Sequence, residues 1–172
     1  MPFGTDFAIG PPGTKPDRRR RSRCEAGPAA ARIPRRRLQR TVLSKKLLAV
    51  AIAAIGFAVS CWAYFPGLMN PDSSDQFRQA LTHRFDDWHP TILAGIWVLT
   101  NAVLPGPAGL FLVLTALYWL GFLLIAFFLI GIRSDRYLVV MLLPFMPFLF
   151  NIAGTLCIDL LVLGSFLVAL GL

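Results

Sequence analysis

The run of residues from 108 to 132, AGLFLVLTALYWLGFLLIAFFLIGI, is apolar from end to end and carries no charged side chain. A helix needs about 20 apolar residues to cross a bilayer core about 30 Å thick, so this run is long enough to span a membrane. Residues 47–66 are also uncharged and long enough. With 56% hydrophobic residues and a mean hydropathy of +0.63, the chain lies outside the usual range of soluble domains. We therefore expect an integral membrane protein.

Three further segments have a similar apolar composition. The sequence therefore predicts an all-α fold, a polytopic transmembrane helix bundle over residues 45–172 with about four or five membrane segments. The segments are expected near residues 46–66, 90–104, 108–132, 137–150 and 155–172. The last one stops without a polar flank, so we expect the chain to be the N-terminal part of a longer protein.

Two of these segments, 90–104 and 137–150, are short for a full crossing, and this leaves two topologies open. If both cross, the loop with Arg133 and Arg136 lies outside, against the positive-inside rule, and Asp159 begins the last helix near the cytoplasm. If one of them is instead re-entrant, either the two arginines lie inside or Asp159 lies outside.

The net charge of +8 comes mainly from the N-terminal region, where thirteen of the 17 Lys and Arg residues lie between Lys15 and Lys46. Such clusters can bind nucleic-acid phosphates, but here a membrane helix follows at once, which favours cytoplasmic retention and contact with acidic lipid headgroups. Residues 1–44 are expected to be a disordered cytoplasmic tail, and no nucleic-acid partner is expected. The predicted location is the bacterial plasma membrane, with the N-terminus in the cytoplasm.

The loop between the first two apolar segments, residues 67–89, is then extracytoplasmic and holds most of the polar chemistry. It contains four of the nine acidic residues and both histidines. Within it, Ser73 and Gln76 are predicted to form a helix capping box, while Phe77, Leu81 and Phe85 recur at helical spacing. The pattern predicts a short amphipathic helix that lies in the membrane interface with this apolar face down.

Carboxylates beside an interfacial helix suit an enzyme that acts on a lipid-linked substrate. One carboxylate could serve as a general base on the acceptor, and a second acid or a histidine could bind a divalent metal or orient the donor phosphate. The alternative is structural, because Asp72 and Asp75 at a helix start would also stabilise that helix. The candidates for catalysis, metal or substrate contact are Asp72, Asp75, Asp86, Asp87, His89 and Asp159, with Arg78 and Arg84 suited to phosphate.

The two stretches YFPGLMNPDSSDQFRQA and DDWHPTILAGIW, after a first membrane helix, resemble the start of the GT-C superfamily of polytopic glycosyltransferases. That superfamily includes protein O-mannosyltransferases and aminoarabinose transferases. The resemblance implies that Asp72 is the first acid of the loop motif and the general base, and that Asp159 is a later acid of the site. It also implies transfer of a sugar from a polyprenyl-phosphate-linked donor to an extracytoplasmic acceptor. Ser73 stands where the family often has Glu, and Thr91 stands where it has a second proline.

A non-enzymatic membrane protein is the alternative class: a transporter or channel subunit, or an inactive remnant. Transporters usually carry internal repeats and charged groups near the bilayer midplane. Here the charges cluster beside the apolar segments, no repeat is visible, and Asp159 is the one exception. These features favour the transferase.

Overall fold

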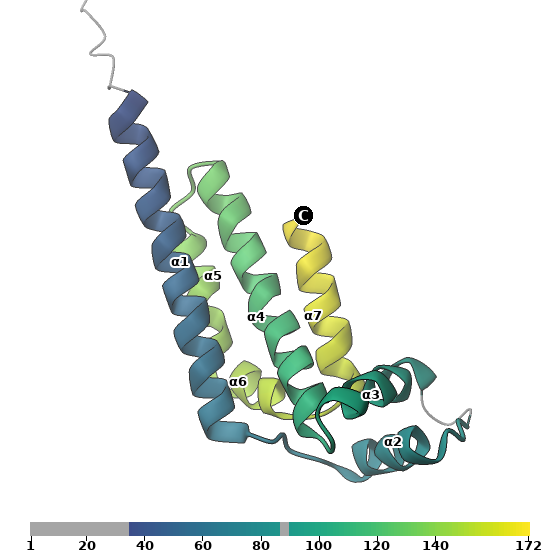
Figure 1. Cartoon of the computed structure of the whole chain (residues 1–172). Coiled ribbons are helices and arrows are strands. Elements are labelled where there is room, and N and C mark those ends of the chain that lie inside the picture. The colour runs from purple at the N-terminus through teal and green to yellow at the C-terminus, as the bar shows by residue number, and fades with distance from the viewer. Residues whose placement is uncertain (1–34, 87–89) are drawn as a thin grey trace, which may run out of the picture. The chain divides into compact units, whose positions relative to one another are not determined.

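The computed structural model describes residues 35–86 and 90–172, which form helices, turns and one isolated bridging pair, Leu68 and Thr155 (Figure 1). The expected all-α fold is confirmed for this part of the chain. The helices are α1 (Arg35–Tyr64), α2 (Pro71–Thr82), α3 (Thr91–Val103), α4 (Ala108–Gly131), α5 (Tyr137–Leu142), the 3₁₀ turn η2 (Leu143–Phe145), α6 (Pro147–Gly154) and α7 (Ile158–Gly171).

The first helix is longer than its apolar run. Because α1 begins at Arg35, it extends into the segment predicted as a disordered tail, and the expected boundary at residue 44 is too late. Arg, Lys, Leu and Gln are good helix formers, so the helix continues into the basic segment. The rest of the predicted tail, residues 1–34, lies outside the described residues.

Two helices are long and apolar enough to cross a membrane, residues Gln39–Tyr64 of α1 and the whole of α4. A third crossing is possible if Tyr137–Phe145 and Pro147–Gly154, which meet at 63°, act as one broken span. The break follows from proline, which cannot donate a backbone hydrogen bond inside a helix. The two remaining apolar helices, α3 and α7, have 13 and 14 residues. At 1.5 Å per residue each is about 20 Å long, shorter than a bilayer core.

Helices α1 and α4 pack closely and run in opposite directions (Figure 1). Gly56 makes this contact possible, because a Cβ there would lie only 2.1 Å from Cη2 of Trp119. The buried Trp119 indole Nε1 donates a hydrogen bond to Ser60 Oγ at 3.1 Å, and Ser60 Oγ donates to the Gly56 carbonyl at 2.9 Å. The Trp119 ring thus packs against Gly56 and Ser60 and holds α1 and α4 in contact.

The antiparallel pair defines two ends of the described bundle. At the Lys45 end, named for the ion pair between Lys45 and Asp135, the start of α1 lies beside the turn that follows α4. At the opposite, Asp72 end, the residues after α1 lie beside the segment that joins α6 to α7. There the Leu68 amide donates to the Gly154 carbonyl at 2.9 Å, and the Leu156 amide donates to the Leu68 carbonyl at 3.0 Å.

Helix α7 lies parallel to α4, in a tight contact made by glycines. A Cβ on Gly164 would lie 3.0 Å from Leu117 Cγ, and a Cβ on Gly171 would lie 2.6 Å from Leu124 Cβ. Since both residue numbers rise together along the contact, the helices run in the same direction. Small residues at a helix interface allow close backbone approach, as is common among membrane helices.

Helix α3 stays at the Asp72 end, between α2 and the start of α4 (Figure 1). The Trp97 indole Nε1 donates to the Gly106 carbonyl at 3.0 Å, and the Trp97 ring lies 4.9 Å from that of Phe77. Because α3 does not carry the chain to the other end, Arg133 lies at the Lys45 end and Asp159 at the Asp72 end. This choice between the two topologies could not be made from the sequence.

Candidate functional site

Helix α2 carries the predicted site residues Asp72, Asp75 and Arg78, and Asn70 is its N-cap. The Ser73 amide donates to Asn70 Oδ1 at 2.7 Å, and the Asn70 amide donates to Ser73 Oγ at 2.7 Å. The predicted capping box of Ser73 and Gln76 is therefore wrong by three residues. The reason is Pro71, which suits the first helical position and leaves the cap to the extended residue before it. Asp72 is consequently in the first turn, where the helix dipole favours a carboxylate.

The buried face of α2 is mostly polar rather than apolar. Its buried side chains are Ser73, Gln76, Gln79 and Ala80, whereas two of the three predicted apolar contacts, Leu81 and Phe85, are exposed. Phe77 alone of that set packs into the fold, against Trp97. The expected placement of this apolar face in the membrane interface stays a prediction, since Leu81 and Phe85 are exposed on the described chain.

Two of the candidate acids, Asp72 and Asp159, line one pocket of about 90 Å³ at the Asp72 end. Its wall from α2 comprises Asn70, Asp72, Ser73 and Gln76, and its wall from the start of α7 comprises Leu156, Cys157, Ile158 and Asp159. Both carboxylates lie in the first turn of their helix and both residues are exposed. Two helix N-termini thus converge on one small space, which favours negative charge there.

The backbone around Leu68 holds the two walls of the Asp72 pocket together. Gly67 has φ +112°, a conformation that residues with a Cβ rarely adopt. A Cβ at this position would also lie 3.0 Å from Cγ of Leu156. The glycine therefore lets the chain after α1 come close enough to pair with the segment before α7.

Gln76 adds an unusual polar group to the Asp72 pocket. Its side chain is 3% exposed, and its Oε1 atom has no hydrogen-bond partner among the described residues. A buried carbonyl oxygen without a donor is costly, so a ligand hydroxyl or amine is well matched to this position. In the sequence, Gln76 lies one helical turn after Asp72, and this spacing is the signal that could have placed it in the site. The sequence pattern instead assigns Gln76 to the capping box.

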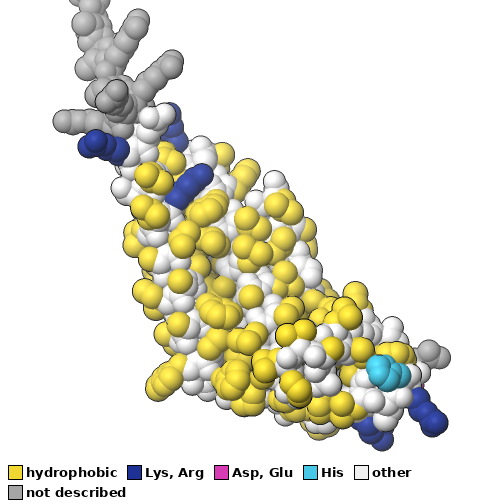
Figure 2. Space-filling model, viewed as in Figure 1, with side chains coloured by type: hydrophobic (Ala, Val, Ile, Leu, Met, Phe, Trp, Pro, Cys, Tyr) yellow, Lys and Arg dark blue, Asp and Glu magenta, His cyan; other side chains and the backbone are white. Residues whose placement is uncertain are grey.

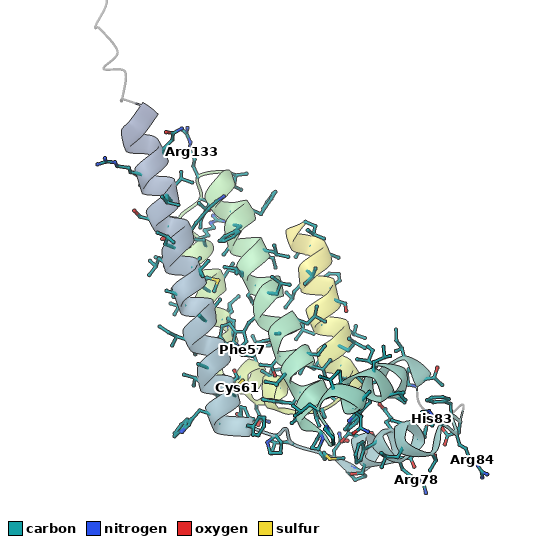
Figure 3. The ribbon with its side chains drawn as sticks, viewed as in Figure 1. Phe57, Cys61, Arg78, His83, Arg84 and Arg133 are labelled. Carbon is teal, nitrogen blue, oxygen red and sulfur yellow. The ribbon has the colours of Figure 1, made fainter. Side chains whose placement is uncertain are left out.

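The remaining α2 candidates form a separate group. Asp75 accepts from Arg78 Nη2 in an ion pair and from Gln79 Nε2 at 2.9 Å, and Gln79 Nε2 also donates to Asp86 Oδ1 at 2.9 Å. Arg78, Arg84 and Asp86 line a cleft of about 300 Å³ beside the end of α2, where both arginines are visible in Figure 3. Gln79 Nε2 therefore links Asp75 to Asp86.

Two predicted candidates, Asp87 and His89, lie outside the described residues. Among residues 35–86 and 90–172, no cluster of three or more His, Cys, Asp and Glu side chains is placed to hold a metal ion. Asp72 and Asp159 bring two carboxylates to one pocket. Mg²⁺ commonly takes one or two protein carboxylates and completes its shell with water and substrate phosphate.

The fold places this chain in the class of helical membrane proteins, with two or three helices able to span a bilayer. Comparison with known proteins goes no further, because no family model, curated protein or solved structure matches the chain.

Proposed function

We propose that the chain is a GT-C-like integral membrane glycosyltransferase, which moves a sugar from a polyprenyl-phosphate-linked donor to an extracytoplasmic acceptor. The observation that carries this proposal is the shared pocket of Asp72 and Asp159. In the family that the sequence resembles, an acid of the first outer loop acts with an acid several helices later. Here those two acids come from residues far apart in the chain and line one small space.

The proposed orientation puts the Lys45 end in the cytoplasm and the Asp72 end outside. The basic N-terminal region, Lys45, Lys46, Arg133 and Arg136 then all lie on the cytoplasmic side, as the positive-inside rule requires. On the face shown in Figure 2, Lys and Arg side chains gather over the start of α1 and around α2, with hydrophobic surface between them. Helices α2 and α3 would lie at the outer interface, with α7 as a further membrane segment beside α4.

Within this proposal each group has a defined chemical task. Asp72 accepts the proton of the acceptor hydroxyl or amine as the acceptor attacks the sugar carbon and the phosphate leaves. The Gln76 carbonyl accepts a hydrogen bond from the acceptor and so positions it. Arg78 and Arg84, in the neighbouring cleft, suit the donor phosphate. A Mg²⁺ ion held by Asp159, with water and the donor phosphate in its shell, would help to neutralise the phosphate charge.

One observation favours a second, non-enzymatic function. The Asp72 pocket measures about 90 Å³, whereas pockets that enclose a small-molecule ligand usually measure about 300–1,000 Å³. The described residues therefore surround the reacting groups but do not enclose a sugar. A transporter or channel subunit, or an inactive remnant, would fit this volume without requiring catalysis.

The test is sugar transfer in membranes that contain the protein, with a panel of polyprenyl-phosphate-linked sugars as donors. Asp72→Asn should lower transfer by about 10²- to 10⁴-fold, because general base catalysis contributes that much. Asp159→Asn should also lower transfer. The matched control is Asp135→Asn, which removes an exposed carboxylate at the opposite end of the bundle. Transfer that is unchanged in Asp72→Asn would rule out Asp72 as the base. Transfer that is absent in the wild type with every donor would favour the non-enzymatic class.

A further inference from the structure

A different charged pocket lies at the Lys45 end, on the other side of the bundle from the Asp72 pocket. It measures about 360 Å³ and is lined by Gln39, Val42, Leu43, Lys46 and Arg133. The first four residues recur at helical spacing on α1, so they share one face of that helix. Arg133 comes from the turn after α4, and its side chain lies beside the start of α1 (Figure 3).

The two cations of this pocket are not neutralised within the described chain. The ion pairs among the described residues join Lys45 to Asp135 and Arg78 to Asp75. Neither Lys46 nor Arg133 therefore has an acidic partner among those residues. The Lys46 ammonium lies 5.3 Å from the centroid of the Phe127 ring, which helps to fix its position. Two like charges that line one pocket repel each other, and an anion between them would relieve that repulsion.

The backbone at Arg133 supports a role for its side chain. Helix α4 ends in a Schellman motif, in which the Arg133 amide donates to the Ile130 carbonyl at 3.1 Å and the Ser134 amide donates to the Leu129 carbonyl at 2.9 Å. Arg133 has φ +59° at the position of this motif where glycine is preferred. A long cationic residue thus occupies a site where glycine would be more stable.

The surface around the pocket is apolar. Leu43 and Leu47 on α1 and Ile132 beside Arg133 are 59%, 61% and 60% exposed. A soluble anion would leave this surface uncovered, whereas the acyl chains of a lipid would cover it. The pocket also lies at the end of two membrane-length helices, at the level where headgroups meet the hydrocarbon core.

We propose that Lys46, Arg133 and Gln39 form a binding site for the headgroup phosphate of an anionic phospholipid. The phosphate oxygens accept hydrogen bonds from the Lys46 ammonium and the Arg133 guanidinium, while the Gln39 amide donates to the headgroup hydroxyls. The acyl chains lie along Leu43 and Leu47. This site depends on the membrane location of the helices, and it is independent of sugar transfer.

The test measures lipid retention by the full-length protein in uncharged detergent, by native mass spectrometry, without any sugar donor. The probes are phosphatidylglycerol, phosphatidylcholine and soluble glycerol phosphate. Phosphatidylglycerol should be retained, and Arg133→Gly and Lys46→Gln should each weaken its binding about tenfold, because each removes a charge-assisted hydrogen bond. The matched control is Arg136→Gln, which removes an exposed cation from the same turn and should change binding less than about twofold.

Arg133→Gly also separates lost binding from lost folding. Because glycine adopts the left-handed conformation without strain, this variant should unfold at the same temperature as the wild type or higher while binding less lipid. Equal retention by Arg133→Gly and the wild type would overturn the proposal. Equal retention of phosphatidylcholine would also overturn it, and displacement of the lipid by equimolar glycerol phosphate would show a soluble anion site instead.

Discussion

The contact between α4 and α7 gives the sharpest stability prediction, through Gly121→Ala. A Cβ on Gly121 would lie 2.5 Å from Leu167 Cβ and 3.2 Å from the Val168 amide nitrogen. Carbon atoms in contact prefer separations of about 3.5–4.0 Å, and Leu167 Cβ cannot move away by a rotamer change. The helices must therefore separate, which should cost about 1–3 kcal/mol, as overpacking usually does. The higher helix propensity of alanine returns up to about 1 kcal/mol.

The matched control is Gly131→Ala in the same helix, where an added Cβ would meet nothing within 4 Å. This variant should be neutral or slightly more stable than the wild type, so the two variants should differ by about 2 kcal/mol, or about 30-fold in the unfolding equilibrium. Unfolding in mixed micelles can be followed by the fluorescence of Trp97 and Trp119, which are buried. If Gly121→Ala proves as stable as Gly131→Ala, the close contact between α4 and α7 does not exist.

Three further predictions test other parts of the fold. The double variant Leu117→Cys, Gly164→Cys, with the native cysteines replaced, should form a disulfide on oxidation, because a Cβ on residue 164 would lie 3.0 Å from Leu117 Cγ. If α4 and α7 instead ran antiparallel, the two residues would lie apart and both thiols would stay free. Asn70→Ala should cost about 1 kcal/mol and speed amide hydrogen exchange at the start of α2, since the cap is lost; unchanged exchange would refute the cap. Trp119→Phe should cost about 1–2 kcal/mol, because Ser60 loses a buried donor; a neutral result would mean that water replaces the indole.

The parts of the fold that could be predicted from sequence depend on length and charge alone. The uncharged runs in α1 and α4 are long enough to cross a bilayer core, and a helix satisfies the backbone groups of such a run within the run itself. Small residues on a membrane helix favour close packing, and Gly121 of α4 makes such a contact with α7. These features need no knowledge of neighbouring segments.

The details of α2 were not predictable in the same way, because they depend on its neighbours. The spacing of Phe77, Leu81 and Phe85 indicates a helix, and α2 forms, but Phe85 lies beyond its end at Thr82. The spacing also does not show which face meets α3. The cap was misplaced because Ser73 looks like a first residue until Pro71 is recognised as the helix start. The hydrogen bond from Gln79 to Asp86 likewise depends on how the chain turns after α2, which helical spacing does not show.

Whether Asp72 and Asp159 lie at the same end of the bundle depends on how many times the chain crosses the bundle between them. An even number of crossings between the two residues puts them at the same end, and an odd number puts them at opposite ends. Residues 90–104 and 137–150 looked equally short, so length could not decide the count. In the structure the second segment continues through its proline break to Gly154 and returns the chain to the Asp72 end, whereas α3 stays at that end. Pro144 and Pro147, which make residues 137–150 look interrupted, thus lie within the segment that brings the chain back to the Asp72 end.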